Sequence, residues 1–541
     1  MESVYNVSDA YRAAVFWSFN DKLEDERLTA QLERLVGAGL TGGFMHSRVG
    51  LVTAYLSDDW MQRLAACCER AREMGTVLWL YDEDRWPSGY GGGQVIREHP
   101  ECKSKALCLI EDNATEDPRI LQVYKTVDYE GKRYRIALCE QKTGNPWYAG
   151  GCYVDLLDPA ATDAFLQSTH ERYRERLGEY FGKEIQGVFS DEFCYSQRAA
   201  YPYPNVPFTR GFEERFCRSR GYSLLDVMEK LFFDLPGYQR VRFDFYDELT
   251  SCFIEAFTAR YRGWCQKNGL QLTGHLMNED TLTGQTEWIG AAMPHYAEMD
   301  MPGIDMLGSA ASQPATVLQL TSVAEQLGKR ALCEALGCIG HQSGPAEMKR
   351  LTDYLAALGI SFINPHLTLY SMRGERKRDY PPNISWMQPW FDAARGYFDH
   401  IARVCELMSE GECETDLLLL HPIGSVWSEM SPLHKMNPTY SIWSQAGTYA
   451  RQNYLTETET VEKPFFELTE ALLHKSIPFH YGDERLMEAY GTDEDGYLCI
   501  GRCRYRRVIV PPMTTIRRAT LLRLERLAAQ NGPQAVVFGN V

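Results

Sequence analysis

The 541-residue sequence has no long hydrophobic run and no excess of positive charge. No apolar segment approaches the roughly 18–20 residues that a membrane-spanning helix needs. The start, MESVYNVSDAYRAAVFW, has no basic region followed by an apolar run, so we expect no signal peptide. With 73 acidic and 56 basic residues the formal net charge is −17, which argues against nucleic acid or an anionic membrane as a partner.

Several chemical motifs are also missing. The 16 cysteines are scattered without CxxC pairs, which favours free thiols in a reducing cytoplasm over disulfides or zinc. The sequence contains neither HExxH nor GxSxG, so zinc-protease and serine-hydrolase chemistry have no support. GxxxxGK is absent, and the GxGxxG match at residues 37–42 follows a helical pattern and not a strand, so no nucleotide cofactor is indicated. A calcium site built from scattered carboxylates leaves no such pattern, so the sequence does not decide whether the protein binds calcium.

The chain instead shows a regular alternation of short apolar runs and amphipathic helical segments over residues 1–410. Composition is that of a globular protein, with 44% hydrophobic and 24% charged residues. Eight apolar runs are each followed by a helical pattern: 14–19, 42–47, 76–81, 185–189, 270–276, 304–307, 331–334 and 360–369. Such alternation predicts a parallel (β/α)8 barrel.

Two segments depart from that rhythm. Residues 103–150 show alternating, β-rich stretches and predict a small β insertion after the third barrel strand. After Gly411 a second α/β pattern begins, so we expect an accessory domain of Rossmann or glutamine-amidotransferase-like type over residues 411–541. Its final strand lies close to Val541, and we expect the domain to be minimal or truncated.

Carboxylates follow two of the predicted strands directly. Asp191 and Glu192 come after the run 185–189, and Glu334 ends the run 331–334. Barrel enzymes place catalytic groups at the carboxyl ends of their strands, and two such carboxyls suit glycosidic bond cleavage. We interpret Glu192 as the general acid and Glu334 as the base. Strand alternation turns Asp191 away from Glu192, so Asp191 is a helper or a helix cap.

The most unusual stretch is YDEDRWPSGYGGG, residues 81–93. Asp82, Glu83 and Arg85 could pair with sugar hydroxyls, and Trp86 offers a flat apolar face to a pyranose ring. The alternative is a charged, glycine-rich turn held by internal salt bridges. We expect these side chains to share one cleft with Glu192, because barrel strand ends converge.

Other strand ends carry further candidates. In LTGHLMNED, residues 272–280, His275 could hydrogen-bond substrate and Glu279 is the main rival for the base. A lone histidine is, however, as often a satisfied core group as a functional one. The remaining polar residues near strand ends are His46, Arg48, Asp305, His366 and Tyr370, of which His46, His366 and Tyr370 are predicted to bind substrate.

Taken in order, several motifs resemble glycoside hydrolase family 106, the α-L-rhamnosidase-like proteins. The motifs, within residues 14–400, are LSDDW, YDEDRWPSGYGGG, FSDEF, LTGHLMNED, MPHYAEMDMPGID, SVAEQLGKRALCEALGC and RKRDYPP. The resemblance implies a barrel followed by further domains, inverting hydrolysis of α-L-rhamnosides, and calcium near the site. Relative to that family the chain is short, so we expect the later β-rich modules to be missing from it.

We therefore expect a glycoside hydrolase that removes a terminal sugar from a carbohydrate, an α-L-rhamnoside first. One alternative is a retaining, β-galactosidase-like barrel, and another is a non-catalytic carbohydrate-binding barrel. The separation of the two carboxyls distinguishes the mechanisms, about 6.5–9.5 Å for inversion and about 5–5.5 Å for retention. The sequence leaves the exact sugar, the linkage and the oligomeric state open.

Overall fold

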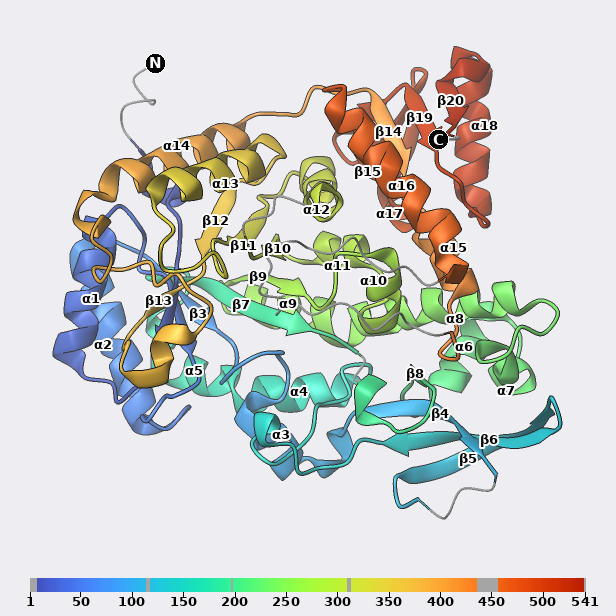
Figure 1. Ribbon diagram of the computed structural model, residues 1–541, viewed down its shortest axis with the longest axis horizontal. Coiled ribbons are helices and arrows are strands. Elements are labelled where there is room, and N and C mark those ends of the chain that lie inside the picture. Colours follow the sequence, from blue (N-terminus) through green and yellow to red (C-terminus); the bar gives the residue numbers. More distant parts are fainter. Residues whose placement is uncertain (1–6, 113–116, 196–197, 309–312, 435–455, 540–541) are drawn as a thin grey trace.

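A closed barrel of parallel strands forms the centre of the chain in the computed structural model (Figure 1). The structure describes residues 7–112, 117–195, 198–308, 313–434 and 456–539. The barrel strands are β1 (Phe16–Phe19), β2 (Phe44–Ser47), β3 (Leu78–Tyr81), β7 (Ile185–Phe193), β9 (Gln271–Leu276), β10 (Met301–Met306), β11 (Leu332–Ala335), β12 (Phe362–Pro365) and β13 (Thr368–Leu369). β12 pairs with β11, and β13, only three residues further on, pairs with β1. The last two strands therefore act as one, which confirms the predicted (β/α)8 barrel.

Helices surround the barrel, and the sequence shows why each forms where it does. In α2 (Asp58–Met74) the Ser57 side chain accepts a hydrogen bond from Trp60 N at the first turn. Trp60, Leu64 and Ala71 recur at helical spacing and are fully buried, and Gly75 ends the helix in a left-handed conformation. The other outer helices are α1 (Asp25–Gly37), α4 (Pro159–Ser168), α5 (His170–Leu177), α8 (Tyr238–Phe253), α9 (Ala259–Lys267), α10 (Leu282–Trp288), α11 (Ala292–Glu298), α12 (Pro314–Leu327), α13 (Pro345–Ala357) and α14 (Arg395–Glu410).

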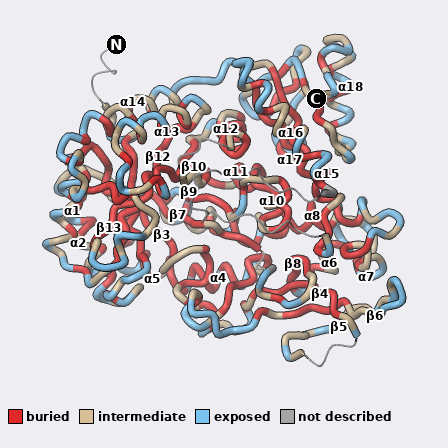
Figure 2. Tube along the Cα trace, in the orientation of Figure 1, coloured by how far each residue is buried: buried red, intermediate tan, exposed pale blue. Residues whose placement is uncertain are grey.

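Alternate residues of each barrel strand fill two separate apolar regions, one inside the barrel and one between strands and helices. Buried positions dominate the strands, as Figure 2 shows. On β3, Trp79 and Tyr81 belong to the interior, whereas Leu78 and Leu80 pack toward the helices. The interior set is Ala14, Phe16, Phe44, Trp79, Tyr81, Phe189, Met301, Leu332, Phe362, Leu367 and Leu369. This alternation decides which residue at each strand end points into the barrel.

The β-rich segment after β3 forms a separate antiparallel sheet at the lower edge of Figure 1. Its order is β5-β6-β4-β8, with β4 (Lys105–Glu111), β5 (Ile120–Tyr129) and β6 (Lys132–Glu140) from the predicted insertion. The fourth strand, β8 (Asn205–Pro207), comes from the chain after β7 and pairs with β4. That short strand ties the insertion to the chain that follows β7.

The C-terminal part forms a parallel four-stranded sheet in the order β15-β14-β19-β20. Its strands are β14 (Leu417–Leu420), β15 (His480–Gly482), β19 (Arg507–Val510) and β20 (Val536–Phe538), with α15 (Ile423–Glu429), α16 (Thr456–His474), α17 (Glu484–Tyr490) and α18 (Arg518–Asn531) beside them. A small antiparallel sheet joins β16 (Gly491–Glu494), β17 (Tyr497–Ile500) and β18 (Cys503–Tyr505). Glu462 on α16 accepts hydrogen bonds from the Thr283 N–H and hydroxyl, which links this part to the barrel helices.

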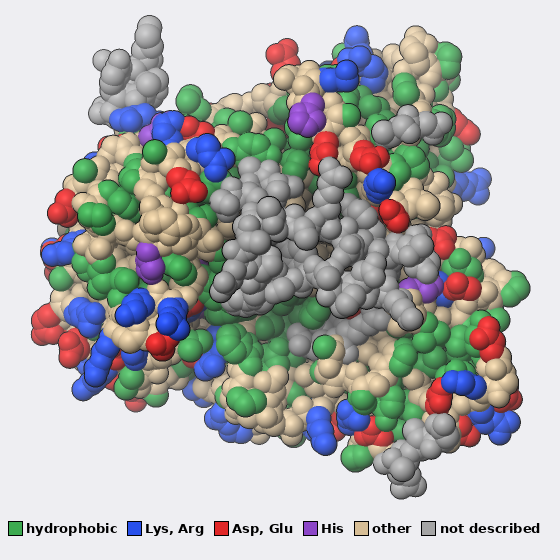
Figure 3. All heavy atoms as spheres, viewed as in Figure 1, with side chains coloured by type: hydrophobic (Ala, Val, Ile, Leu, Met, Phe, Trp, Pro, Cys, Tyr) green, Lys and Arg blue, Asp and Glu red, His purple; other side chains and the backbone are tan. Residues whose placement is uncertain are grey.

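The surface is mixed in charge. On the face seen in Figure 3, Lys and Arg side chains lie among Asp and Glu side chains around the edge. Across the described residues, no helix combines the length and the apolar character that crossing a membrane requires.

One irregularity of the barrel lies beside the predicted site. Between the pairs Ser190–Gly274 and Phe193–Leu276, β7 has one residue more than β9, so β7 carries a bulge. Glu192 within the bulge has a φ of 48°. Gly274 makes the arrangement possible, because a Cβ atom there would lie 1.9 Å from the Ser190 carbonyl oxygen.

Gly274→Ala is therefore expected to destabilise the fold by about 3 kcal/mol or more, since neither backbone can yield without breaking the sheet. Urea unfolding followed by circular dichroism measures the change. Gly263→Ala on α9 is the matched control: a Cβ there meets nothing within 4 Å, and the substitution should be neutral or stabilising. Equal stability of the two variants would show that the bulge does not depend on the glycine.

Candidate active site

Polar side chains replace apolar ones in the uppermost layer of the barrel interior, at the carboxyl ends of the strands. His46, Tyr81, Asp191 and Glu334 each lie two residues beyond an interior apolar residue, namely Phe44, Trp79, Phe189 and Leu332. His275 on β9 and Asp305 on β10 complete the layer, and their strands lie between those of Asp191 and Glu334 in the sheet. Six neighbouring strands thus contribute to one polar layer, which is where barrel enzymes carry their chemistry.

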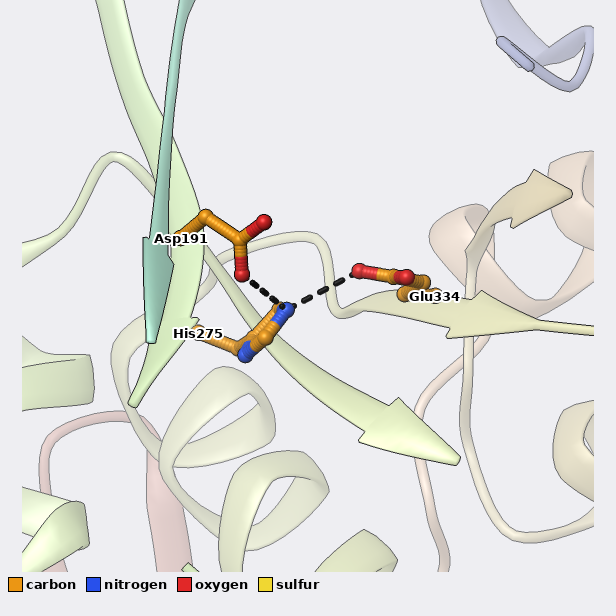
Figure 4. Close-up of side chains that lie close together, drawn as sticks. All are labelled: Asp191, His275 and Glu334. Carbon is orange, nitrogen blue, oxygen red and sulfur yellow. Dashed lines mark hydrogen bonds and ion pairs between the residues drawn. The ribbon is translucent and has the colours of Figure 1, made fainter. Parts of the chain in front are cut away.

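His275 bridges two carboxylates at the centre of this layer (Figure 4). Its Nε2 lies 2.9 Å from Glu334 Oε2 and 3.2 Å from Asp191 Oδ1, and all three side chains are buried. Burial opposes protonation of His275, but the hydrogen bond to Glu334 and the charge of Asp191 outweigh it and raise the histidine pKa well above its usual value. The arrangement is a cation held between two anions.

Burial raises the pKa of Glu334 above its usual value, and the hydrogen bond from His275 offsets only part of that rise. The other carboxylate oxygen, Oε1, lies 4.0 Å from His366 Nε2. Glu334 thus has one oxygen fixed by a cationic partner and a second oxygen directed at a neutral histidine.

Glu192 follows Asp191 in the bulge and is half-buried. Burial and then the neighbouring charge of Asp191 raise the pKa of Glu192 to about 8, with smaller contributions from Glu334 and Glu279. Near neutral pH this carboxyl holds its proton. The sequence had placed Asp191 as a helper or a cap; in the structure Asp191 takes the inward position, contacts His275 and accepts a 2.6 Å hydrogen bond from the Tyr81 hydroxyl.

Glu279, the rival base, is held by the protein through both oxygens. Oε2 accepts a 2.6 Å hydrogen bond from the Tyr296 hydroxyl, and Oε1 accepts the Asp305 N–H at 3.0 Å. Burial raises the pKa of Glu279 to about 7. Its contacts connect the β9 end to β10, which favours a supporting role over a direct one.

The structure corrects the expectation that Asp82 and Glu83 reach substrate. Both side chains are fully buried. Glu83 accepts backbone N–H groups of Gly91 and Gly92, each at 2.6 Å, and so folds the glycine-rich loop around itself. Asp82 accepts hydrogen bonds from the Ser88 hydroxyl at 2.6 Å and the Tyr261 hydroxyl at 3.0 Å.

Arg85 and Trp86, from the same loop, remain half-buried. Arg85 pairs with Asp84 at 2.9 Å, which is the internal salt bridge that the alternative interpretation of this loop predicts. The Trp86 ring meets the edge of Trp147, and the Arg48 guanidinium lies over it at 4.4 Å.

Arg48, at the end of β2, connects more of the site than its sequence pattern indicated. It forms a two-bond ion pair with Asp379 at 2.9 Å through Nε and Nη2. Its Nη1 lies 3.0 Å from His46 Nε2, and Nη2 also lies 3.3 Å from His366 Nε2. Burial and the charge of Arg48 lower the pKa of both histidines, that of His366 to about 3, so both are neutral. Asp379 lies in the RKRDYPP motif, but no strand pattern marks it.

Tyr370 is not at the barrel mouth, contrary to the prediction. Its hydroxyl accepts the Glu24 N–H at 3.2 Å, and the Arg27 guanidinium stacks 4.2 Å from its ring. Both partners belong to the start of α1, so Tyr370 packs on the outer side of the barrel.

The donor atoms of the site show whether it suits the calcium that the family resemblance implies. Among the described residues, Asp191, His275 and Glu334 form the one group whose ligand atoms lie within 4.8 Å of one another. Calcium prefers six to eight oxygens, yet the central atom here is an imidazole nitrogen already bonded to both carboxylates. His275 Nδ1 also has no hydrogen-bond partner in the part of the chain that the structure describes, whereas a metal-bound histidine ordinarily donates through its second nitrogen. These residues do not fit calcium.

Comparison with known proteins gives a distant sequence match and extensive structural ones. No protein-family model matches the sequence. A predicted β-glucuronidase of Formosa agariphila is 22% identical over 289 residues, which cover 50% of this chain and 22% of that protein. The match thus spans less than a quarter of the relative's length.

Several solved structures share the fold over nearly the whole chain. A rhamnosidase from Novosphingobium sp. PP1Y superposes with a TM-score of 0.67 at 12% identity, covering 99% of this chain and 69% of that one. A β-galactosidase from Rahnella sp. R3 gives 0.58 at 12% identity, covering 97% and 70%. A GH42 β-galactosidase from G. stearothermophilus gives 0.55 at 11% identity, covering 97% and 71%. The chain has the barrel fold of these glycosidases.

Proposed function

We propose that the protein is a glycoside hydrolase that removes a terminal sugar, with an α-L-rhamnoside as the preferred substrate. One observation carries the proposal: two strand-end glutamates at the same end of the barrel differ in what holds them. Glu192 has a pKa of about 8 and retains its proton, while Glu334 receives a hydrogen bond from the cationic His275. A protonated acid and a supported anion are the two groups that glycoside hydrolysis needs.

In this mechanism Glu192 gives its proton to the leaving glycosidic oxygen as the bond to the anomeric carbon breaks. Glu334 removes a proton from the attacking water, so the reaction inverts the anomeric configuration. His275 keeps Glu334 oriented by the 2.9 Å hydrogen bond, and Asp191 holds His275 from the other side at 3.2 Å. The family resemblance and the shared fold with a rhamnosidase support the choice of sugar.

A panel of nitrophenyl glycosides tests the proposal. We expect nitrophenol release from the α-L-rhamnoside and none from a Glu192→Gln/Glu334→Gln double variant. The panel includes the β-galactoside and the β-glucuronide, because proteins of both names share the fold or part of the sequence. Proton NMR of the first sugar released reports inversion or retention. A wild-type protein that cleaves no member of the panel would refute the proposal.

Chelation provides a separate prediction. Because the central donor set does not fit calcium, EDTA is expected to leave the rate within about twofold of the untreated protein. Rates are measured before and after dialysis against EDTA, and again after calcium is restored. A large loss that calcium alone restores would show that a calcium ion supports the reaction.

A further inference from the structure

Asp305 is an inward-facing carboxyl at the barrel mouth, and one of its oxygens receives no hydrogen bond from any described residue. Met301 on the same strand lies in the barrel interior and Ile304 faces the helices, so alternation directs Asp305 inward. Its backbone N–H is fixed on Glu279 at 3.0 Å, and its side chain is half-buried. Oδ1 is buried without a hydrogen-bond partner among the described residues. Buried polar atoms are seldom left so, and such an atom calls for an explanation.

The neighbour of Asp305 across the sheet is Glu334. The two residues are register partners in the parallel pair β10–β11, and adjacent strands are about 4.8 Å apart. Glu334 uses Oε2 for His275, while Oε1 has only His366 Nε2 nearby, at 4.0 Å. Side by side, then, lie two carboxyl groups with oxygens that lack a donor within the described part of the chain.

We propose that Asp305 is a further catalytic residue, and this inference rests on the proposed function. Asp305 and Glu334 together hold the water molecule that attacks the sugar. One hydrogen of the water points to Glu334 and the other to Asp305, which directs the oxygen lone pair at the anomeric carbon. As the water oxygen bonds to that carbon, its proton passes to Glu334. The electron pair of the broken glycosidic bond stays on the leaving oxygen, which takes the Glu192 proton. Asp305 neither gains nor loses a proton in this step.

Charge is compatible with this role. Burial and the charge of Glu334 raise the pKa of Asp305 well above its usual value, which favours the neutral form. A neutral carboxyl still accepts a hydrogen bond through its carbonyl oxygen. It also avoids adding another negative charge beside Glu334 and Asp191, which are already buried together.

The test compares Asp305→Ala with Asp305→Asn, since asparagine keeps a carbonyl acceptor and alanine has none. We expect Asp305→Ala to lower kcat by about 10²-fold, with KM nearly unchanged, because only the attack of water is impaired. The loss should be equal for a nitrophenyl and a methyl glycoside, since Asp305 does not act on the leaving group. Asp305→Asn is expected to stay within about tenfold of the wild type.

Three results would overturn the assignment: near-normal kcat in Asp305→Ala, a loss that appears in KM and so reports sugar binding, or a loss confined to the methyl glycoside. If Asp305→Ala does not fold, the acid limb of kcat/KM in Asp305→Asn decides. Because Asp305 is neutral, asparagine leaves the charge beside Glu334 unchanged, so that limb should stay at the wild-type pH, and a limb moved to lower pH contradicts the role. A wild type inactive on all glycosides refutes the proposed function instead, whereas an active wild type with an inactive Glu334→Gln and a normal Asp305→Ala refutes only Asp305.

Discussion

Glu334→Gln is expected to lower kcat by about 10²–10⁴-fold, the usual effect of removing a general base. Glutamine has the same shape and can still contact His275, so the loss reports the missing proton acceptor and not a collapsed site. KM should change little, because the base acts on water. Because the base acts on the attacking water and not on the leaving group, activated and unactivated glycosides should lose rate alike. Steady-state kinetics on both substrates measures this.

Glu279→Gln is the matched comparison. Glu279 lies at the end of the neighbouring strand and was the alternative base from the sequence, but Tyr296 and the Asp305 N–H occupy both of its oxygens. We therefore expect Glu279→Gln to lose less rate than Glu334→Gln and more stability, because a buried acceptor of two hydrogen bonds is altered. The reverse order, with Glu334→Gln active and Glu279→Gln inactive, would transfer the role of base to Glu279.

The barrel and much of its mouth could be predicted because both follow from periodicity. Eight apolar runs separated by helical patterns leave few other topologies, and residues that follow parallel strands must meet at one end. His275 and Glu334 are far apart in sequence, yet their ring nitrogen and carboxylate oxygen are 2.9 Å apart. The strand pattern alone was enough to place these two residues at the same end of the barrel.

Other parts of the site depended on local geometry that a pattern does not carry. The bulge in β7 requires one extra residue opposite β9, and only the closeness of Gly274 to Ser190 shows it. Alternation from Phe189 turns Asp191 inward, and it cannot show the bulged backbone of Glu192 beside it. The role of Glu83 could not be predicted either, because a carboxylate followed by glycines can bind a ligand or the backbone of its own loop. In the structure Glu83 accepts hydrogen bonds from backbone N–H groups of that loop.

Long-range pairs were the least predictable. Arg48 and Asp379 are separated by 331 residues, and neither periodicity nor a motif rule links them. Tyr370 shows the opposite error, because its position beside a strand end suggested the mouth. One residue decides between the inner and outer sides of a strand, and Leu369, the residue before it, takes the inner side.

The Glu192 carboxyl should set the alkaline limit of activity. Its pKa is raised to about 8, so the proton needed by the leaving group is present below that pH and is lost as the pH rises through it. A wild-type profile of kcat on an unactivated glycoside is expected to fall above about pH 8. Asp82 and Glu279 also have raised pKa values, of about 7. Both carboxyls are hydrogen-bonded to protein groups, so their titration does not supply the proton for the leaving oxygen.

Glu192→Gln is accordingly expected to lower the rate on a methyl glycoside by about 10²–10⁴-fold and to remove the alkaline fall from what activity remains. A dinitrophenyl glycoside, whose leaving group needs no proton, should lose far less rate with the same variant. Glu179→Gln, at an exposed position remote from the mouth, is the control and should match the wild type on both substrates. The contrast between leaving groups is specific to an acid, since a damaged fold or a weakened sugar contact would slow both substrates together. Equal losses on the two glycosides, or an alkaline limb that persists in Glu192→Gln, would assign the proton donor to another carboxyl of the same layer.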